Sequence, residues 1–471
     1  MADASARVDD WERHLSAPFR GRQVICAFEV LAAMTGWVAK LQRWGAERPL
    51  LISDGVGTGP LPLETEADAV VLDHPPNQTL TEQVRARMSS SWLTEQARAA
   101  VEAYDPAGEA VWWVSPPAVN EPLMGRAVLG GRPRKQAALE DKLAVDAILD
   151  AVGATRAASV AAPARHNDLL AASRAIGAEV GSTPVVWAGD ARDGINGGGD
   201  YVRLIRTTDQ AQAAAQFFSA SCDQVRVSSW LEGIPCSVHG LVLPDGVVTL
   251  RPLELASLRD DERGRFVYAG MGTGWDPPAA DTDDMRALAR LVGAHLAAAY
   301  GYRGAYGIDG VLTTEGFRVT ELNPRFSGVL TMFSRVSPST HLDLVQVNAV
   351  IGRDVGRSAA DIEQAALADL DASRFADVMG LTSAVRPTRT SSVMVSSDGE
   401  RLVVTEDEDV AIGVVSFGPA STGGFVRLAL ADGTVMPGQR TAPLAVVLFE
   451  LADALWGTGF GSLSMPIDAR V

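Results

Sequence analysis

Lysine is nearly missing from this chain of 471 residues, where only three of the 41 basic residues are lysines. They stand at Lys40, Lys135 and Lys142, and none follows a glycine, so the chain has no Walker A phosphate loop. The six histidines lie far apart, which excludes an H-E-x-x-H zinc helix, and no serine stands in G-x-S-x-G. The common P-loop, zinc-hydrolase and serine-hydrolase sites are therefore excluded.

Cysteine and long apolar runs are scarce as well. Cys26, Cys222 and Cys236 are odd in number and form no C-x-x-C pair, which suits a reducing compartment without a disulfide framework. The chain has no run of 18 apolar residues, and its first ten residues are acidic and polar, unlike a signal peptide. We therefore expect a cytoplasmic protein with no membrane partner.

The charge balance is strongly acidic, with a formal net charge of −17. Nucleic-acid binding needs clustered lysine and arginine, so nucleic acid is not an expected partner. Any nucleotide site must gather its basic groups locally. The length predicts about three domains with ample hydrophobic core.

The first part of the chain has the alternation of an α/β domain. Short apolar segments at 22–28, 50–53, 69–72 and 110–114 read as strands, and segments 31–44 and 79–104 read as helices. Such alternation predicts a parallel sheet that is open at its edge. The glycine loop at 55–59 is expected to be a tight turn, because Pro60 stands where a dinucleotide fingerprint needs glycine.

The pattern changes further along the chain. Residues 135–152 read as a helix, short strands and hairpins follow over about 155–250, and helices are expected at 209–221, 280–300 and 340–352. The last 80 residues read as four short strands and a closing helix at 444–456. We predict domains at 1–130, 131–390 (with a lid at about 155–250) and 391–471.

The most informative stretch is a hairpin over 307–325. Apolar and β-branched residues flank Thr314-Glu315-Gly316, which reads as a three-residue loop with a left-handed glycine. If the hairpin is centred on Glu315, Asp309 faces Glu321, although a bulge after the turn would slip this register by one. Glu321, Asn323 and Arg325 share one strand face.

Two carboxylates about 5 Å apart would repel each other unless a cation lies between them. Two carboxylates and an amide carbonyl are hard oxygen donors, the set that suits Mg²⁺ shared with substrate phosphates. Arg325 adds a fixed positive fork on the same face, suited to phosphate or carboxylate. The alternative is a surface hairpin with scattered charges.

This arrangement resembles the metal-binding hairpin of the ATP-grasp superfamily, most closely in Glu321-Leu322-Asn323-Pro324-Arg325-Phe326-Ser327-Gly328. The resemblance implies an ATP-grasp fold of α/β class (α+β lid), with an N-terminal open α/β pre-ATP-grasp domain and a small C-terminal β-rich domain. It implies Asp309, Glu321 and Asn323 as metal ligands for magnesium, as two ions that Mn²⁺ could replace. It also implies that Glu321, Asn323 and Arg325 take part in catalysis, with Arg325 touching the reacting group.

The resemblance extends to the phosphate side of an ATP site. An Asp-Lys pair ahead of the lid points to Lys142 as a phosphate ligand. The glycines of the loop at 194–199, Gly197 and Gly198 among them, would let backbone N–H groups approach phosphates. The family's second lysine ends a strand written Pro-x-Val-x-Lys, but Pro184-Val185-Val186 ends here in Trp187, so Arg203 or Arg206 would have to replace it.

The adenosine side matches less closely. The segment Val227-Ser228-Ser229-Trp230-Leu231-Glu232-Gly233 resembles the hinge that bonds adenine through its backbone, so Ser229, Leu231 and Glu232 are candidates. Glu254 is a further nucleotide-binding candidate, although Arg251 and Glu254 point to different faces of an extended segment and only one can face the site. In many ligases of the superfamily an arginine lies two residues before the metal-binding Asp. Gly307 occupies this position here, so Arg303 and Arg325 are the alternative arginines for that role.

Over the whole chain, the sequence most resembles pheganomycin-type peptide ligases, through Gly130-Gly131-Arg132-Pro133, Leu139-Glu140-Asp141-Lys142 and the segment 232–240. This resemblance implies an ATP-dependent carboxylate–amine ligase of peptide natural product biosynthesis. It would join a small carboxylate to the amine of an amino acid or peptide through an acyl phosphate, releasing ADP and phosphate. The oligomeric state stays open, a dimer included.

Two other functions remain open at this point. A catalytically decayed ATP-grasp protein that only binds nucleotide, or acts as a scaffold, is suggested by Trp187, Ser228 and Pro235. The intact Asp309, Glu321 and Asn323 weigh against it. A carboxylase that uses bicarbonate as electrophile is less favoured, because the chain has no biotin-carrier lysine motif.

Overall fold

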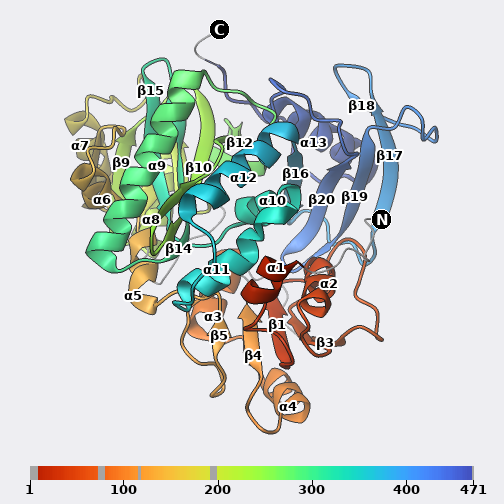
Figure 1. Cartoon of the computed structure of the whole chain (residues 1–471). Coiled ribbons are helices and arrows are strands. Elements are labelled where there is room, and N and C mark those ends of the chain that lie inside the picture. Colours follow the sequence, from red (N-terminus) through yellow and green to blue (C-terminus); the bar gives the residue numbers. More distant parts are fainter. Residues whose placement is uncertain (1–8, 73–79, 115–117, 191, 193–198, 469–471) are drawn as a thin grey trace.

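The computed structural model describes residues 9–72, 80–114, 118–190, 192 and 199–468. Three sheets organise this part of the chain: a five-stranded sheet near the N-terminus, a four-stranded sheet, and an eleven-stranded sheet that continues into the C-terminal strands. Figure 1 shows the N-terminal elements at the bottom, the four-stranded sheet at the left and the C-terminal strands at the right.

The N-terminal sheet is fully parallel, in the order β3-β2-β1-β4-β5. Every residue of β1, β2 and β4 is buried, as expected for parallel strands covered on both faces. The predicted parallel α/β arrangement is therefore confirmed. Its elements are α1 (Asp10–Leu15), β1 (Val24–Phe28), η1 (Leu31–Met34), α2 (Thr35–Arg43), β2 (Leu50–Ser53), β3 (Asp68–Val71), α3 (Leu80–Ser89), α4 (Glu95–Tyr104), β4 (Val111–Val114) and β5 (Val128–Leu129).

The helix predicted over 79–104 is two helices. Ser90 adopts a left-handed conformation with φ of 62°, which ends α3, and the Thr94 side chain accepts from the Ala97 N–H to start α4. The helix predicted over 135–152 is likewise broken, into α5 (Arg134–Ala137), η2 (Ala138–Glu140) and α6 (Val145–Ala151). Lys142 lies in the break before α6 rather than inside a helix.

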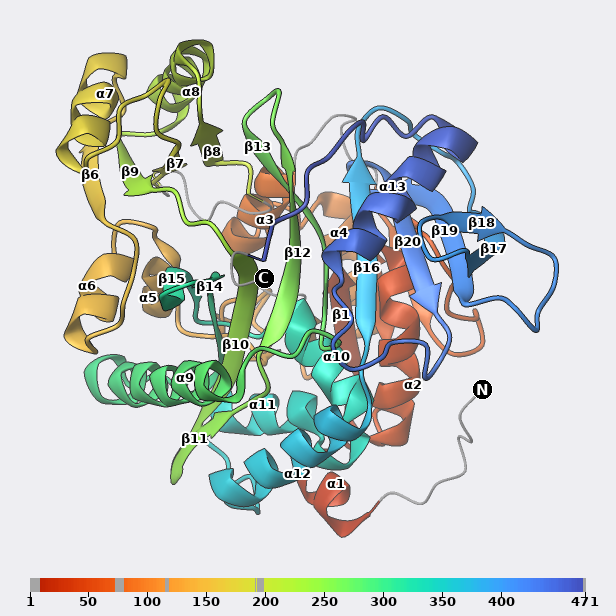
Figure 2. The same ribbon diagram turned by 90° about the horizontal axis from the view of Figure 1, so that it is seen from above.

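The four-stranded sheet lies within the predicted lid, and this sheet with its helices is called the lid below; its strand order is β6-β9-β7-β8. Its helices pack on one face, where Trp187, Phe218 and Val227 are completely buried. Figure 2 places this lid apart from the C-terminal strands, above α6 and β15. Its elements are β6 (Ser159–Pro163), α7 (His166–Ala175), β7 (Val185–Gly189), β8 (Val202–Ile205), α8 (Thr208–Ser221) and β9 (Gln224–Ser229).

The eleven-stranded sheet begins at the predicted hairpin, in the order β15-β14-β10-β12-β13-β16-β20-β19-β17-β18, with β11 beside β10. The predicted lid end at about 250 is wrong, because β10 (Ile234–Leu243) and β11 (Gly246–Thr249) belong to this sheet. The other strands of its first half are β12 (Leu253–Asp260), β13 (Arg265–Gly272), β14 (Gly304–Thr313) and β15 (Gly316–Asn323).

Helices cover both faces of this half of the sheet. Side chains of α9 (Ala279–Tyr300) join the even-numbered residues of β10 in one core, and α10 (Gly328–Val336), α11 (Leu342–Val350) and α12 (Ala359–Ala372) join Leu241 and Leu243 in another. The second core also takes in β1, α2 and Trp113, so the N-terminal domain packs directly on this face. η3 (Pro338–Thr340) connects α10 to α11.

The C-terminal strands extend the same sheet through β16 (Ala376–Thr382), which pairs with β13 on one side and β20 on the other. They are β17 (Ser391–Ser397), β18 (Leu402–Val404), β19 (Gly413–Ala420) and β20 (Gly423–Leu430), followed by α13 (Ala442–Trp456). Across the described ranges, every helix is too short or too polar to cross a membrane.

Candidate active site

The hairpin of β14 and β15 pairs Asp309 with Glu321, as the sequence predicts, but for a different reason. Thr313 pairs with Gly316, so the loop has two residues instead of three. The register this turn sets would place position 309 opposite 320. An irregularity between the pairs Gly310–Val319 and Asp309–Glu321 inserts Thr320 as an extra residue and moves Glu321 opposite Asp309.

The polar side chains of this face form a connected cluster. The Asn323 Nδ2 donates to Asp309 Oδ2 at 2.8 Å, and Arg325 Nη2 donates to Asn323 Oδ1 at 3.3 Å. Ser237, which lies opposite Asp309 on β10, donates its hydroxyl to Asp309 Oδ1 at 2.6 Å. The three predicted metal ligands are thus brought together.

The two carboxyl groups differ in their electrostatics. Burial and the charge of Glu321 raise the pKa of Asp309 to about 6, against the opposing effects of Ser237 and Arg325. Burial also acts to raise the pKa of Glu321, but Lys142, Arg325 and Arg226 outweigh it, so this pKa lies below its ordinary value. The nearby positive groups thus compensate the charge of Glu321 but do not offset the effects of burial and of Glu321 on Asp309.

Lys142 supplies one of the compensating charges. Its Nζ lies 2.9 Å from Glu321 Oε1, and its side chain is 14% exposed. The Asp141 side chain accepts from the Leu143 N–H at 2.8 Å, which shapes the chain break that presents Lys142. Lys142 thus lies beside the hairpin cluster, in a chain break and not inside a helix as predicted, and its role as a phosphate ligand stays a prediction.

Arg325 is fixed by a residue to which the sequence argument gave no role. Glu140 Oε1 lies 3.0 Å from Arg325 Nε and 2.7 Å from Arg132 Nη2, and the side chains of Glu140 and Arg132 are each 5% exposed. Arg132 also donates to the backbone carbonyl of Pro324 at 2.5 Å. Glu140 and Arg132 occur in the two motifs quoted from the sequence, but their contacts depend on a fold that brings position 140 to 325.

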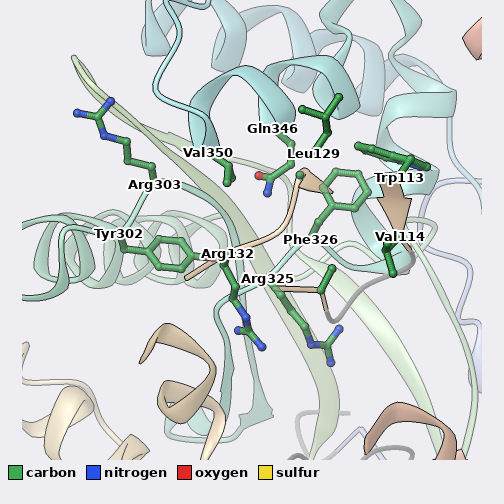
Figure 3. Close-up of a pocket in the computed structure, with 12 residues that line it drawn as sticks. Trp113, Val114, Leu129, Arg132, Tyr302, Arg303, Arg325, Phe326, Gln346 and Val350 are labelled. Atoms are coloured by element: carbon green, nitrogen blue, oxygen red, sulfur yellow. The ribbon is translucent and has the colours of Figure 1, made fainter. Parts of the chain in front are cut away.

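A pocket opens beside Arg325, between the N-terminal sheet and the segment after β15. Trp113, Val114 and Phe326 lie on one side of it, and Gln346 and Leu129 lie above, as Figure 3 shows. Arg132 and Arg325 point their guanidinium groups the same way at its lower edge, whereas the Arg303 guanidinium points away from the other side chains. Of the two arginine alternatives, Arg325 is thus the one that joins the hairpin cluster.

Glycine at 307 also has a physical reason. A Cβ at this position would lie 2.6 Å from Nε2 of His239, which is buried on the neighbouring strand. Burial lowers the pKa of His239 to about 3, with a smaller contribution from Arg325, so the imidazole is neutral. The space that a side chain at position 307 would need is filled by this histidine.

The lid departs from the expectation at Trp187. Its side chain is completely buried in the lid core and donates to Ser173 Oγ at 3.1 Å, so it faces the lid helices. Arg203, its partner on β8, lies over the Phe217 ring at 4.4 Å on the same face, and Arg206 lies 3.3 Å from Asp261. Neither arginine replaces the missing lysine. In the pattern Pro-x-Val-x-Lys counted from Pro184, the lysine position is Ala188.

The hinge residues are only partly available to a nucleotide. The Ser229 N–H donates to the carbonyl of Ala158 at 2.9 Å, so this group is already engaged. Glu232 is 46% exposed and accepts from the Trp230 indole N–H at 2.9 Å. Leu231 lies half-buried between β9 and β10. The roles of Leu231 and Glu232 stay predictions, and Gly197 and Gly198 lie outside the described residues.

The prediction for Glu254 is wrong. Leu253 pairs with Ser237, and Ser237 pairs with Asp309, so Glu254 projects from the opposite face of the sheet. Its side chain is completely buried, 2.8 Å from Arg440 Nε, and it accepts from the Thr441 N–H at 2.5 Å. Glu254 therefore anchors the start of α13 and does not face the cluster.

The donor set on the hairpin fits magnesium. Within the described residues no group of three His, Cys, Asp or Glu side chains converges as a metal site. Asp309 and Glu321 converge with an amide instead, which leaves coordination positions for water and phosphate oxygens, as Mg²⁺ requires. Arg325 and Lys142 provide the positive charge that binds nucleotide phosphates, and a cation held by the donor set would add to it.

The comparison with sequence families adds to this geometry. A profile of the ATP-grasp domain matches residues 192–329, which run from the lid through the hairpin to Arg325 and α10. The protein contains an ATP-grasp domain. No curated protein matches the sequence significantly.

Solved structures show that the fold similarity extends beyond the matched ATP-grasp domain. The carboxyaminoimidazole ribonucleotide synthase of Aspergillus clavatus, complexed with ATP, shares 12% identity over 94% of this chain and 100% of its own, with a TM-score of 0.50. The phosphoribosylamine–glycine ligase of Thermotoga maritima shares 14% identity over 94% and 98%, with a TM-score of 0.51. The biotin carboxylase domain of the Hydrogenobacter thermophilus 2-oxoglutarate carboxylase, complexed with MgADP, ADP and bicarbonate, shares 12% over 94% and 91%, with a TM-score of 0.52. The parallel N-terminal sheet and the antiparallel sheets thus form an ATP-grasp fold, as the sequence predicts.

Proposed function

We propose that the protein is an ATP-dependent carboxylate–amine ligase that forms an amide bond through an acyl phosphate and releases ADP and phosphate. The observation that carries the proposal is the cluster of Asp309, Glu321 and Asn323, with Lys142 and Arg325 beside it, inside an ATP-grasp domain. The structural neighbours named above include ligases, which supports this class of reaction.

The side chains take distinct roles in this reaction. Lys142 balances negative charge beside Glu321 and can turn to the terminal phosphates of ATP. Asp309, Glu321 and Asn323 would hold Mg²⁺, which when bound neutralises phosphate charge. Arg325, oriented by Glu140, stabilises the negative charge on the oxygen when the amine adds to the acyl phosphate, a contribution of roughly 3 kcal/mol for a well-placed donor.

The acid substrate is expected in the pocket beside Arg325. Its carboxylate would lie against the arginine at the pocket mouth, and its body would have to widen the narrow space beside Trp113, Val114 and Phe326, which are buried in this structure. The lid excludes water, which protects an acyl phosphate from hydrolysis. An amino acid or peptide amine as the acceptor, as the resemblance to pheganomycin-type ligases implies, stays a prediction.

The alternatives are weaker on this geometry. A decayed, nucleotide-binding scaffold was suggested partly by Trp187, but that side chain belongs to the lid core and says nothing about the phosphate site. Bicarbonate as electrophile is kept as an arm of the test, because one structural neighbour was solved with this anion.

The test is ADP and phosphate release from purified protein with Mg²⁺, ATP and a panel of carboxylic acids and amines, with bicarbonate as a separate arm and mass spectrometry of the products. The ligase proposal expects ADP release that needs both an acid and an amine, with one amide per ADP. Asn323→Ala should lower this rate strongly. The matched control is Glu315→Ala in the loop of the same hairpin, where Glu315 is 77% exposed.

Nucleotide binding without turnover across the panel would favour the scaffold. Turnover with bicarbonate alone would favour a carboxylase. Equal ADP release by wild type and Asn323→Ala with every substrate pair would remove Asn323 from the site.

A further inference from the structure

Among the described lid residues, Arg226 is a buried cation on the face of the sheet opposite the lid core. Arg226 lies on β9 between Val225 and Val227, which are completely buried among the lid helices. Because side chains alternate along a strand, Arg226 projects from the opposite face of the lid sheet. Its side chain is only 6% exposed.

Arg226 stands directly across from the position where the lysine pattern places its charge. In the antiparallel pairing of β7 and β9, Ala188 faces Arg226. Cross-strand neighbours have Cβ atoms about 5 Å apart, so a long side chain from either position reaches the same space. Ala188 has no side chain long enough to reach it.

The contacts of Arg226 engage the Nε and Nη2 edge of its guanidinium group and leave Nη1 available for a ligand. Nε and Nη2 donate to the two carboxylate oxygens of Asp146, at 3.1 and 2.8 Å. Nη1 makes no hydrogen bond to any residue in the part of the chain that the structure describes. A bidentate pair of this kind fixes an arginine fork in one orientation.

The anchor of Arg226 is close in sequence to the other phosphate candidate. Asp146 lies four residues after Lys142, in the first turn of α6. Lys142 contacts Glu321, and the charge of Arg226 also acts on Glu321. The two cations therefore lie near the start of α6, Lys142 in the chain break before it and Arg226 on the lid strand that contacts Asp146.

We propose that Arg226 supplies the lid's positive charge to the phosphates of ATP, in place of the lysine that Ala188 lacks. This inference rests on the proposed function, because it assumes that ATP binds between the lid and the hairpin. In this arrangement the positive charge comes from β9 and not from β7, and it lies on the same face of the lid sheet in both cases.

The experiment measures the affinity for MgATP by isothermal titration calorimetry, without acid or amine. Arg226→Gln should weaken binding by about 10- to 100-fold, because it removes a charge-assisted contact to phosphate. Arg226→Lys should retain most of the affinity. Ala188→Lys in the Arg226→Gln background should restore it to within about fivefold of wild type, since the lysine returns to the position expected by the pattern.

Two controls separate a phosphate contact from a structural ion pair. Asp146→Asn removes the charge that pairs with Arg226 but keeps the Arg226 charge, and it also alters the contacts of Asp146 with Ser159 and Arg156, at 2.7 and 3.5 Å. MgATP affinity should stay within about threefold of wild type if Arg226 binds the phosphates. If the pair only holds the lid to α6, Asp146→Asn and Arg226→Gln should weaken binding equally, and the inference is overturned. Arg165→Gln, at a lid position that is 79% exposed, should change nothing.

Unchanged MgATP binding by Arg226→Gln, or no rescue by Ala188→Lys, would also overturn the inference. A failed ligase proposal looks different. Wild type would then bind MgATP, and the Arg226 variants would still differ in MgATP affinity as expected. No pair of acid and amine would give an amide product.

Discussion

Glu140 offers the sharpest test of how the reaction site is built. It lies under Arg325 and Arg132, and both guanidinium groups approach the same carboxylate oxygen, at 3.0 and 2.7 Å. Glu140→Gln keeps an oxygen acceptor of the same shape but removes the charge. The two contacts are ion pairs and not aligned hydrogen bonds, and the Arg325 side chain is 29% exposed. Loss of the charge should therefore weaken the contact that orients Arg325 by about 1.5 kcal/mol, between the values for an exposed pair and for a broken buried pair.

The expected result is a fall in kcat of about tenfold for acid- and amine-dependent ADP release, because 1.4 kcal/mol corresponds to a factor of ten. MgATP affinity should stay within about twofold, since Glu140 touches neither the carboxylates nor Lys142 in this structure. Glu140→Ala leaves Arg132 buried without its partner, so it should cost more, about 100-fold or greater, with a lowered Tm.

Steady-state kinetics on ADP release and calorimetric titration of MgATP give the two readouts. Glu121→Gln is the matched control, because it removes an exposed ion pair with Arg134 in which both side chains are about half exposed (47% and 51%). A kcat for Glu140→Gln equal to that of wild type, or a loss of MgATP affinity as large as the loss of kcat, would refute the assigned role.

Three further outcomes are expected. Asp309→Asn should reduce Mg²⁺ affinity in the presence of ATP by more than about 100-fold, since even residues that only orient metal ligands cost 10- to 100-fold; a Mg²⁺ titration with an unchanged midpoint would contradict this. The folded pKa of His239 is about 3 and the unfolded one about 6.5, so the unfolded state binds the proton first as pH falls. His239 alone should therefore lower stability by about 1.4 kcal/mol for each pH unit between about pH 6.5 and 3. The difference in urea-unfolding free energy between wild type and His239→Gln should change with this slope. Gly307→Ala should destabilise by about 1–3 kcal/mol through the contact with His239, and the double variant with His239→Ala should recover part of the loss, as a thermodynamic cycle would show.

The sequence could predict the hairpin because its information is local. Side-chain alternation and a turn signal are enough to bring Glu321, Asn323 and Arg325 to one face, and the strands and helices near them follow the same rules. Even here the predicted loop length was wrong. The pairing of Asp309 with Glu321 depends on a bulge at Thr320, which no residue of the turn predicts. The bulge compensates for the shorter loop.

What the sequence could not show depends on distant partners. Glu140 reaches Arg325 across 185 positions, and Glu254 turns to Arg440 and away from the hairpin face because α13 begins there. Neither contact leaves a local pattern. The lid end was misplaced for a similar reason, since β10 resembles a lid strand until its pairing with β14 is known. The roles of Leu231 and Glu232 remain predictions for a nucleotide complex to test.

The joining of β13, β16 and β20 has a consequence for the stability of the whole molecule. If the chain were cut near residue 390, β16 would become an exposed edge strand with unpaired amide and carbonyl groups. Such an edge strand can pair with other molecules and cause aggregation. Glu254 would meanwhile lose Arg440 and the Thr441 N–H, leaving a desolvated carboxylate inside the fold. The last 80 residues thus complete the large sheet and the core around Glu254. A protein shortened near residue 390 should therefore aggregate before its activity could be measured.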